Sequence, residues 1–286
     1  MDIPAASRRP IRWWNGVVVF AAAVAFQIGF GTVLWILGGS GALGKTETEV
    51  RAALYGPGSM AFQVVVTAGV LSLLAIAPLR LSRRDAGAEL RLRRPRFATL
   101  VVAAIAVIPL GFVVDEVTYL LGLAAPAVFD PSGLERMAEV FSGASIPGLV
   151  AVTAAVTIGP ALGEELLFRG YLLRAFSHRS PAWLAVGVTA VLFGAIHMNA
   201  LQGAGAFLIG LYLGFLVVRT GSLWPAVVAH GLNNLTCAVF ARVDPQGAGT
   251  AFASGHHPAV VIVSLVGVAA AIAYVATVER GGSPRR

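Results

Sequence analysis

The chain has 286 residues, of which 57% are hydrophobic and only 12% are charged. Soluble globular domains carry about 25% charged residues, so this composition excludes an ordinary soluble domain and predicts an integral membrane protein. The formal net charge is +7, but the arginines lie between apolar runs, so we expect a lipid bilayer and no nucleic acid as partner. The single cysteine, Cys237, excludes an internal disulfide and a cysteine-based metal cluster.

Apolar runs long enough to cross a hydrocarbon core, about 20 residues each, recur along the chain. They predict an all-α, polytopic membrane protein with about eight transmembrane helices in one bundle, at residues 15–38, 59–80, 97–123, 146–176, 182–199, 203–219, 222–240 and 258–278. The first run is expected to stay as a helix, because no small-residue cleavage site of a signal peptide follows it.

Three features lie between the runs or near their ends. Residues 39–58 are predicted to form a glycine-rich outer loop without a site. Residues 127–145 have apolar side chains at helical spacing, which indicates either a short interfacial helix or a plain connecting helix. Asp115 and Glu116 lie near the outer end of the third run, where water reaches them, and we expect both to be structural.

The distribution of arginines predicts how the helices are oriented. Arginines precede the first run, fill the loop 80–96, and follow the fourth, sixth and eighth runs, whereas the alternate loops carry mostly acidic residues. Because cytoplasmic loops are enriched in basic residues, both termini and the loop 80–96 are predicted to be cytoplasmic. We divide the chain into N-terminal helices at 1–145, a core at 146–240, and the last outer loop, helix and basic tail at 241–286.

The stretch ALGEELLFRG, residues 161–170, places ionisable side chains inside a predicted span, where they are costly and indicate a function. Glu165 and Arg169 are four residues apart on one helix face and can form an ion pair. Glu164 is rotated about 100° from Glu165, so we expect it to face a polar cavity. Pro160 weakens the preceding turn. A buried ion-pair cluster that only joins helices is the alternative.

Two more polar groups lie in later runs. Phe193 and His197 share one helix face, and so do His230 and Asn234, whereas Asn233 is expected to point elsewhere. Taken alone, His197 is explained by a hydrogen bond within the bundle, and the other pair by polar contacts between helices.

Depth along the helices favours a common site for these groups. At a rise of 1.5 Å per residue, Glu164 lies roughly 18 Å and His197 roughly 22 Å from the predicted cytoplasmic ends of their helices. His230 and Asn234 lie roughly 12 and 18 Å from the corresponding end of theirs. The three groups therefore fall into one band of depth.

The residue types in this band are suited to amide hydrolysis. A carboxylate and a neutral histidine can hold a water, and the carboxylate can take its proton as the water attacks a carbonyl. His230 and Asn234 could donate hydrogen bonds to the resulting oxyanion. Alternatively, Glu164, His197 and His230 could be three ligands of Zn²⁺, with water in the fourth position.

The motifs E-E-x-x-x-R, F-x-x-x-H and H-x-x-x-N occur in this order within residues 146–240. Together they resemble the CPBP family of intramembrane proteases, which includes the CAAX prenyl protease type, bacteriocin-processing and immunity proteins, and the Abi group. The resemblance implies an all-helical core whose site is sunk in the membrane and open toward the cytosol. Its substrate would be a membrane-associated peptide or protein, and the compact build is compatible with a bacterial cell membrane.

The resemblance also implies a role for each motif residue. Glu164 and His197 would activate the catalytic water. His230 and Asn234 would form the oxyanion hole. The supporting residues would be Glu165, Arg169 and Phe193.

Other classes of membrane protein fit the sequence less well. The motifs H-E-x-x-H and G-x-G-D are absent, and no G-x-S-x pairs with a histidine as in rhomboid proteases. A transporter would need repeated halves and a second broken helix, and the sequence has neither. The remaining alternative is a non-catalytic membrane protein of the same fold, acting as a partner-binding, scaffold or immunity factor.

Overall fold

A computed structural model describes residues 11–243 and 258–278, and every regular element within these ranges is helical. Six of the described helical segments are long and apolar enough to cross a membrane. They are α1 (Trp13–Gly39), α3 (Pro57–Leu81), α5 (Phe97–Ala124), the continuous segment Ile146–Ser177, α10 (Ala200–Thr220) and α12 (Pro258–Val278). The predicted all-α, polytopic membrane fold is confirmed.

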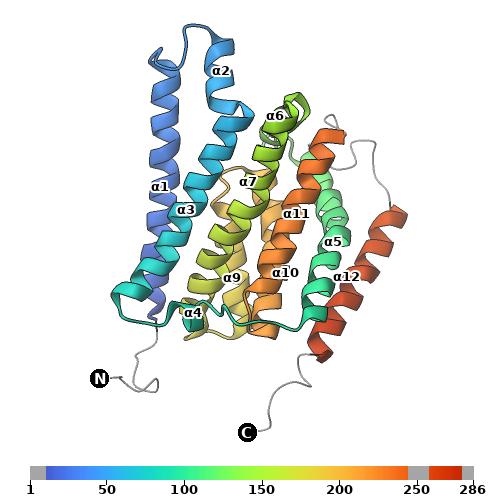
Figure 1. Ribbon diagram of the computed structural model, residues 1–286. Coiled ribbons are helices and arrows are strands. Elements are labelled where there is room, and N and C mark those ends of the chain that lie inside the picture. Colours follow the sequence, from blue (N-terminus) through green and yellow to red (C-terminus); the bar gives the residue numbers. More distant parts are fainter. Residues whose placement is uncertain (1–10, 244–257, 279–286) are drawn as a thin grey trace.

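Two of the eight predicted spans correspond to helices, α9 and α11, that are not among these six segments. α9 (Ala182–Ala195) has 14 residues, so it is about 21 Å long, whereas the hydrocarbon core is about 30 Å thick. α11 (Trp224–Val243) has 20 residues but carries His230, Asn233 and Asn234 along its length. Both helices lie within the bundle beside the others (Figure 1). The count of eight crossings therefore stays a prediction.

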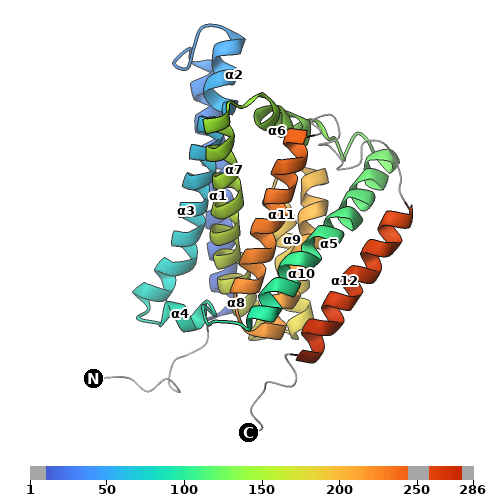
Figure 2. The ribbon, with the colours of Figure 1, turned by 45° about the vertical axis from the view of Figure 1, so that its right-hand side comes forward.

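The helices form one bundle with two distinct ends (Figures 1 and 2). Helices α7, α9, α10 and α11 lie in the centre, with α1 and α3 on one side and α5 and α12 on the other. The beginning of α1, the end of α12 and the short α4 (Ala86–Glu89) lie at one end, which we call the α4 end. Helices α2 (Glu47–Tyr55) and α6 (Ser132–Gly143) lie at the opposite end, the α6 end.

Arginine side chains join the segments that meet at the α4 end. Arg84 forms an ion pair with Glu89 at 2.9 Å, and Arg174 pairs with the same carboxylate. Arg93 donates a hydrogen bond to the carbonyl oxygen of Thr220 at the end of α10. These contacts fix the basic loop between α3 and α5 against the end of the segment Ile146–Ser177 and the end of α10.

Glycines allow the central helices to pack closely. A Cβ atom at Gly163 would lie 2.6 Å from the carbonyl oxygen of Ala68, so α7 and α3 are in backbone contact there. On α10, a Cβ atom at Gly214 would lie 2.8 Å from Cγ1 of Val186 in α9. Small residues at such positions are the usual means by which transmembrane helices approach one another.

The region between α1 and α3 contains a helix where the sequence indicated only a loop. Thr46 caps α2: its Oγ1 accepts a hydrogen bond from the Glu49 amide at 3.2 Å. The Glu49 carboxylate accepts hydrogen bonds from the amides of Lys45 at 2.7 Å and Thr46 at 3.1 Å. These hydrogen bonds, first that from Lys45, hold the pKa of Glu49 below its usual value. The pattern is a reciprocal capping box.

The helix predicted within residues 127–145 is present as α6. Its buried residues Ala138 and Phe141 belong to a small apolar cluster with Val152, Ala238 and Ala241 of α7 and α11. α6 therefore packs one apolar face against α7 and α11.

Candidate active site

The two adjacent glutamates lie where a regular helix ends. α7 (Ile146–Glu165) contains Pro160 and is followed by a π-helical segment, η2 (Leu166–Leu172), and then by α8 (Leu173–Ser177). Proline cannot donate the backbone hydrogen bond of its turn. The wider turns of a π-helix are rare and occur frequently at functional sites. The sequence indicated the weakened turn at Pro160 but carried no signal for the π-helical turns after Glu165.

Glu165 and Arg169 form the ion pair that their spacing predicted. Nη1 of Arg169 lies 2.9 Å from Oε1 of Glu165, and neither side chain has exposed surface. The guanidinium carbon lies 4.2 Å from the ring centroid of Phe193, within the range of a cation–π contact. Gly210 leaves room for the guanidinium, since a Cβ atom there would lie 2.8 Å from Nη2. The negative charge of Glu165 is thus balanced inside the protein.

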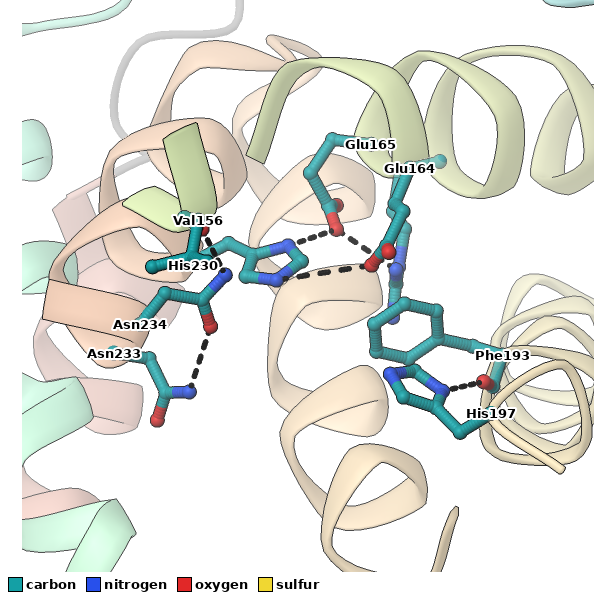
Figure 3. Close-up of polar contacts among 9 residues, drawn as sticks. Val156, Glu164, Glu165, Phe193, His197, His230, Asn233 and Asn234 are labelled. Carbon is teal, nitrogen blue, oxygen red and sulfur yellow. Dashed lines mark hydrogen bonds and ion pairs between the residues drawn. The ribbon is translucent and has the colours of Figure 1, made fainter. Parts of the chain in front are cut away.

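His230 faces the carboxylates of both Glu164 and Glu165 (Figure 3). Its Nδ1 is 2.9 Å from Oε1 of Glu165, and its Nε2 is 3.8 Å from Oε2 of Glu164. Since an ionised carboxylate only accepts hydrogen bonds, Nδ1 carries a proton and donates to Glu165. The connected groups of Arg169, Glu165 and His230 therefore fix the imidazole ring with its Nε2 toward Glu164.

His197 follows the end of α9, and its Nδ1 is 2.8 Å from the carbonyl oxygen of Phe193. A carbonyl oxygen only accepts, so Nδ1 is the donor, and Nε2 of the neutral ring is left as an acceptor. The Phe193 ring packs edge-on against His197 and His230, with centroid distances of 5.1 and 5.8 Å. In the view of Figure 3, the Phe193 ring lies between the His197 ring and the Glu164 carboxylate.

Asn233 and Asn234 interact with each other, contrary to the expectation that Asn233 points elsewhere. Nδ2 of Asn234 donates to the carbonyl oxygen of Val156 at 3.0 Å, and Oδ1 of Asn234 accepts from Nδ2 of Asn233 at 3.3 Å. One amide hydrogen of Asn234 remains for another acceptor. Asn233 was missed, although its spacing of three residues from His230 also places two side chains on one helix face.

A cavity of about 620 Å³ lies among these side chains. Glu164, His197, His230, Asn233 and Asn234 all line it, whereas Glu165 and Arg169 do not. Most of the other lining side chains are apolar. The two glutamates therefore have the different surroundings that the sequence predicted, one facing a cavity and one paired in the protein interior.

Asp115 also lines this cavity, whereas Glu116 does not. Asp115 belongs to α5 and lies near the α6 end, together with Thr118 of the same helix. Both acidic side chains have interactions with other groups. The expectation that Asp115 is structural did not foresee its position on the cavity wall.

The zinc alternative depends on whether Glu164, His197 and His230 come together as metal ligands. Within residues 11–243 and 258–278, no group of three or more His, Cys, Asp or Glu side chains could hold a metal ion. The Nδ1 atoms of His197 and His230 face a carbonyl oxygen and the Glu165 carboxylate. The alternative in which Glu164, His197 and His230 ligate Zn²⁺ stays a prediction, and we assign no step to a metal.

Residues 146–236 match the family model of the type II CAAX prenyl endopeptidase Rce1-like proteins. This segment contains the five motif residues that line the cavity: Glu164, Phe193, His197, His230 and Asn234. Over these residues the chain is therefore similar to the CPBP family. The resemblance drawn from the three motifs is confirmed.

Two curated relatives from Bacillus subtilis (strain 168) are similar to part of the chain. The uncharacterized protein YyaK is 36% identical over 87 residues, which are 27% of this chain and 29% of YyaK. YdiL, named "Putative membrane peptidase", is 28% identical over 101 residues, which are 35% of this chain and 40% of YdiL. The matched region thus spans less than half the length of either relative. No solved structure matches the chain.

Proposed function

We propose that the chain is an intramembrane endopeptidase that hydrolyses a peptide bond of a membrane-associated peptide or protein. The observation that carries the proposal is the contrast between two adjacent glutamates. Glu165 is fully buried and paired with Arg169, whereas Glu164 lines a cavity together with His197 and His230. A carboxylate that is free of a cationic arginine partner and faces a histidine is suited to act as a general base.

The first step is the attack of water on the substrate carbonyl. Glu164 takes one proton of the water as the oxygen forms a bond to the carbonyl carbon. Nε2 of His197 accepts a hydrogen bond from the other water hydrogen and so orients the lone pair toward the carbonyl. Holding water and carbonyl in this geometry lowers the entropic part of the barrier.

The second step is the collapse of the tetrahedral intermediate. His230 takes up a second proton from solvent on Nε2 before this step; Nε2 then donates to the oxyanion, while Nδ1 remains bound to Glu165. The free amide hydrogen of Asn234 is the second donor. The carbon–nitrogen bond then breaks, and Glu164 returns its proton to the leaving amine, which restores the carboxylate.

The comparisons support this class of reaction, because the matched family model is named for endopeptidases and YdiL carries the name of a membrane peptidase. For the substrate, we propose an apolar peptide segment such as a leader peptide, a pheromone-like peptide or part of another membrane protein. The mainly apolar lining of the cavity favours this class.

The experiment is a cleavage assay with the full chain reconstituted in liposomes. A library of membrane-inserting peptides is added in heavy-oxygen water, and products are analysed by mass spectrometry. We expect defined products whose new carboxyl group carries one heavy oxygen, with or without a chelator. Cleavage that is lost with chelator and restored by zinc would contradict a metal-free mechanism. If no peptide were cleaved, the non-catalytic, partner-binding alternative would replace the proposal.

A further inference from the structure

The two ends of the bundle differ in their balance of charge: among the described residues, arginines far outnumber the acidic residues Asp85 and Glu89 at the α4 end, whereas basic residues do not outnumber acidic ones at the α6 end. The described arginines of the α4 end are Arg12, Arg80, Arg83, Arg84, Arg91, Arg93, Arg94, Arg96, Arg174, Arg179 and Arg219. The described basic residues of the α6 end are Lys45, Arg51, Arg136 and Arg242, and they are accompanied by Glu47, Glu49, Asp130, Glu135 and Glu139. The excess of basic residues assigns the α4 end to the cytoplasmic side.

The cavity extends from the middle of the bundle toward the α6 end. Glu164 and His230, which line it, lie near the middle of the segment Ile146–Ser177 and of α11. The lining then continues along the halves of the helices that are nearer to the α6 end, at Met60, Gln63, Leu201, Gln202, Phe240 and Ala241. Leu134 and Met137 of α6 itself complete the lining.

The other direction, from Glu164 toward the α4 end, is filled with protein. The residues that follow Glu165 in η2 and α8 belong to the apolar core, and Leu167, Phe168, Leu172 and Leu173 have no exposed surface. None of these four side chains lines the cavity. A substrate therefore cannot reach Glu164 from the α4 end without displacing tightly packed core side chains.

We propose that this cavity opens on the extracytoplasmic side of the membrane, and that the substrate is an apolar segment that reaches the site from that side. The part of the proposal that concerns the substrate rests on the peptidase function proposed above. The part that concerns the orientation of the cavity does not depend on that function. It differs from the cytosol-facing site that the family resemblance implied. Both the arginine distribution and the packed floor of the cavity favour the outward direction.

Orientation is tested by labelling single cysteines in the full chain, with Cys237 replaced by alanine. Glu135→Cys, in exposed α6, reports on the α6 end, and Met137→Cys reports on the cavity wall. His178→Cys, in the exposed turn after α8, is the matched reporter at the α4 end. Each variant is expressed in bacterial cells and treated with a membrane-impermeant maleimide before and after permeabilisation.

We expect Glu135→Cys and Met137→Cys to be modified in intact cells, and His178→Cys only after permeabilisation. The reverse pattern, or modification of both ends in intact cells, would overturn the proposal. A second variant of the wall, Gln202→Cys, repeats the test on α10 if Met137→Cys fails to fold.

A cleavage arm separates the orientation from the peptidase function. A peptide that the reconstituted protein cleaves is added to right-side-out and to inverted membrane vesicles that contain the chain. Cleavage in right-side-out vesicles, and its absence in inverted vesicles, is the expected result. Cleavage only in inverted vesicles would overturn the proposal. If no peptide is cleaved in either preparation, the proposed peptidase function is wrong, and so is the proposal about its substrate. The cysteine labelling still decides the orientation of the cavity.

Discussion

At the scale of single residues, the two adjacent glutamates, Glu164 and Glu165, have different surroundings. The pairing of Glu165 with Arg169 could be predicted from the spacing of four residues, and so could the turn of Glu164 toward a cavity. The contact of Glu165 with His230 could not, because the two residues are 65 positions apart and meet only through the packing of α7 and α11. The position of Asn233 on the cavity wall, beside His230, was predictable from helical spacing alone.

The asparagines are expected to differ in their effect on catalysis. Asn234→Ala removes a proposed oxyanion donor, so kcat should fall by roughly 10²–10³ with little change in KM. Asn233→Ala removes only the hydrogen bond that orients Oδ1 of Asn234, so its loss of kcat should be smaller. Steady-state kinetics in liposomes measure both. An equal loss for the two variants would argue against Asn234 as the direct donor.

The buried pair of Glu165 and Arg169 predicts strong coupling in stability. Arg169→Met leaves a carboxylate buried without its arginine partner, which should cost about 3–5 kcal/mol. Combining it with Glu165→Gln removes the unpaired charge, so the double variant should unfold at a higher temperature than Arg169→Met alone. Thermal unfolding in detergent measures this double-mutant cycle. Additive losses would show that the two side chains are not energetically coupled.

At the scale of elements, the apolar runs predicted the long helices but not the irregular ones. The run over residues 146–176 lies in one continuous helical segment, yet seven of its residues, Leu166–Leu172, are π-helical, and the apolar pattern carries no signal for them. α2 was missed because the glycine-rich surroundings of residues 39–58 outweighed the Thr46–Glu49 capping pattern. That pattern is a recognised start signal for a helix and could have been used.

Gly163 is expected to control the approach of α7 to α3. Gly163→Ala would place a Cβ atom 2.6 Å from a backbone oxygen, so the helices must separate, at a cost of about 1–3 kcal/mol. The matched control is Gly69→Ala on α3, where a Cβ atom would meet nothing within 4 Å. The control should be neutral or stabilising, because alanine is a better helix former than glycine. Equal unfolding temperatures for the two variants would refute this role.

α2 is expected to lose stability in acid. The pKa of Glu49 is lower in the folded chain than its usual value of about 4.3, because the amides of Lys45 and Thr46 donate to its carboxylate. The stabilisation is therefore complete above about pH 4.3 and is lost as the pH falls through the lower folded-state pKa. Hydrogen exchange of residues 47–55, corrected for intrinsic rates, should show falling protection in acid. Glu49→Gln should abolish this pH dependence, and an unchanged dependence would contradict the capping role.

At the scale of the whole molecule, the bundle converts separate motifs into one site. The similar depth of Glu164, His197 and His230 was predictable from helix geometry, because each lies roughly 12–22 Å from the predicted cytoplasmic end of its run. The direction in which the cavity opens was not predictable, since it depends on which half of each helix is packed and on the position of α6. The family resemblance implied a cytosolic opening, whereas most of the described arginines lie at the α4 end and the cavity extends toward the α6 end.

The central claim is that Glu164 is the general base of peptide hydrolysis. The most direct measurement is the cleavage rate of Glu164→Gln in liposomes, beside Glu139→Gln as a matched control on exposed α6 outside the cavity. General-base catalysis contributes about 10²–10⁴-fold, so Glu164→Gln should lower kcat by at least that range, while Glu139→Gln retains the wild-type rate. A Glu164→Gln variant that is correctly folded and cleaves as fast as the wild type would contradict the claim.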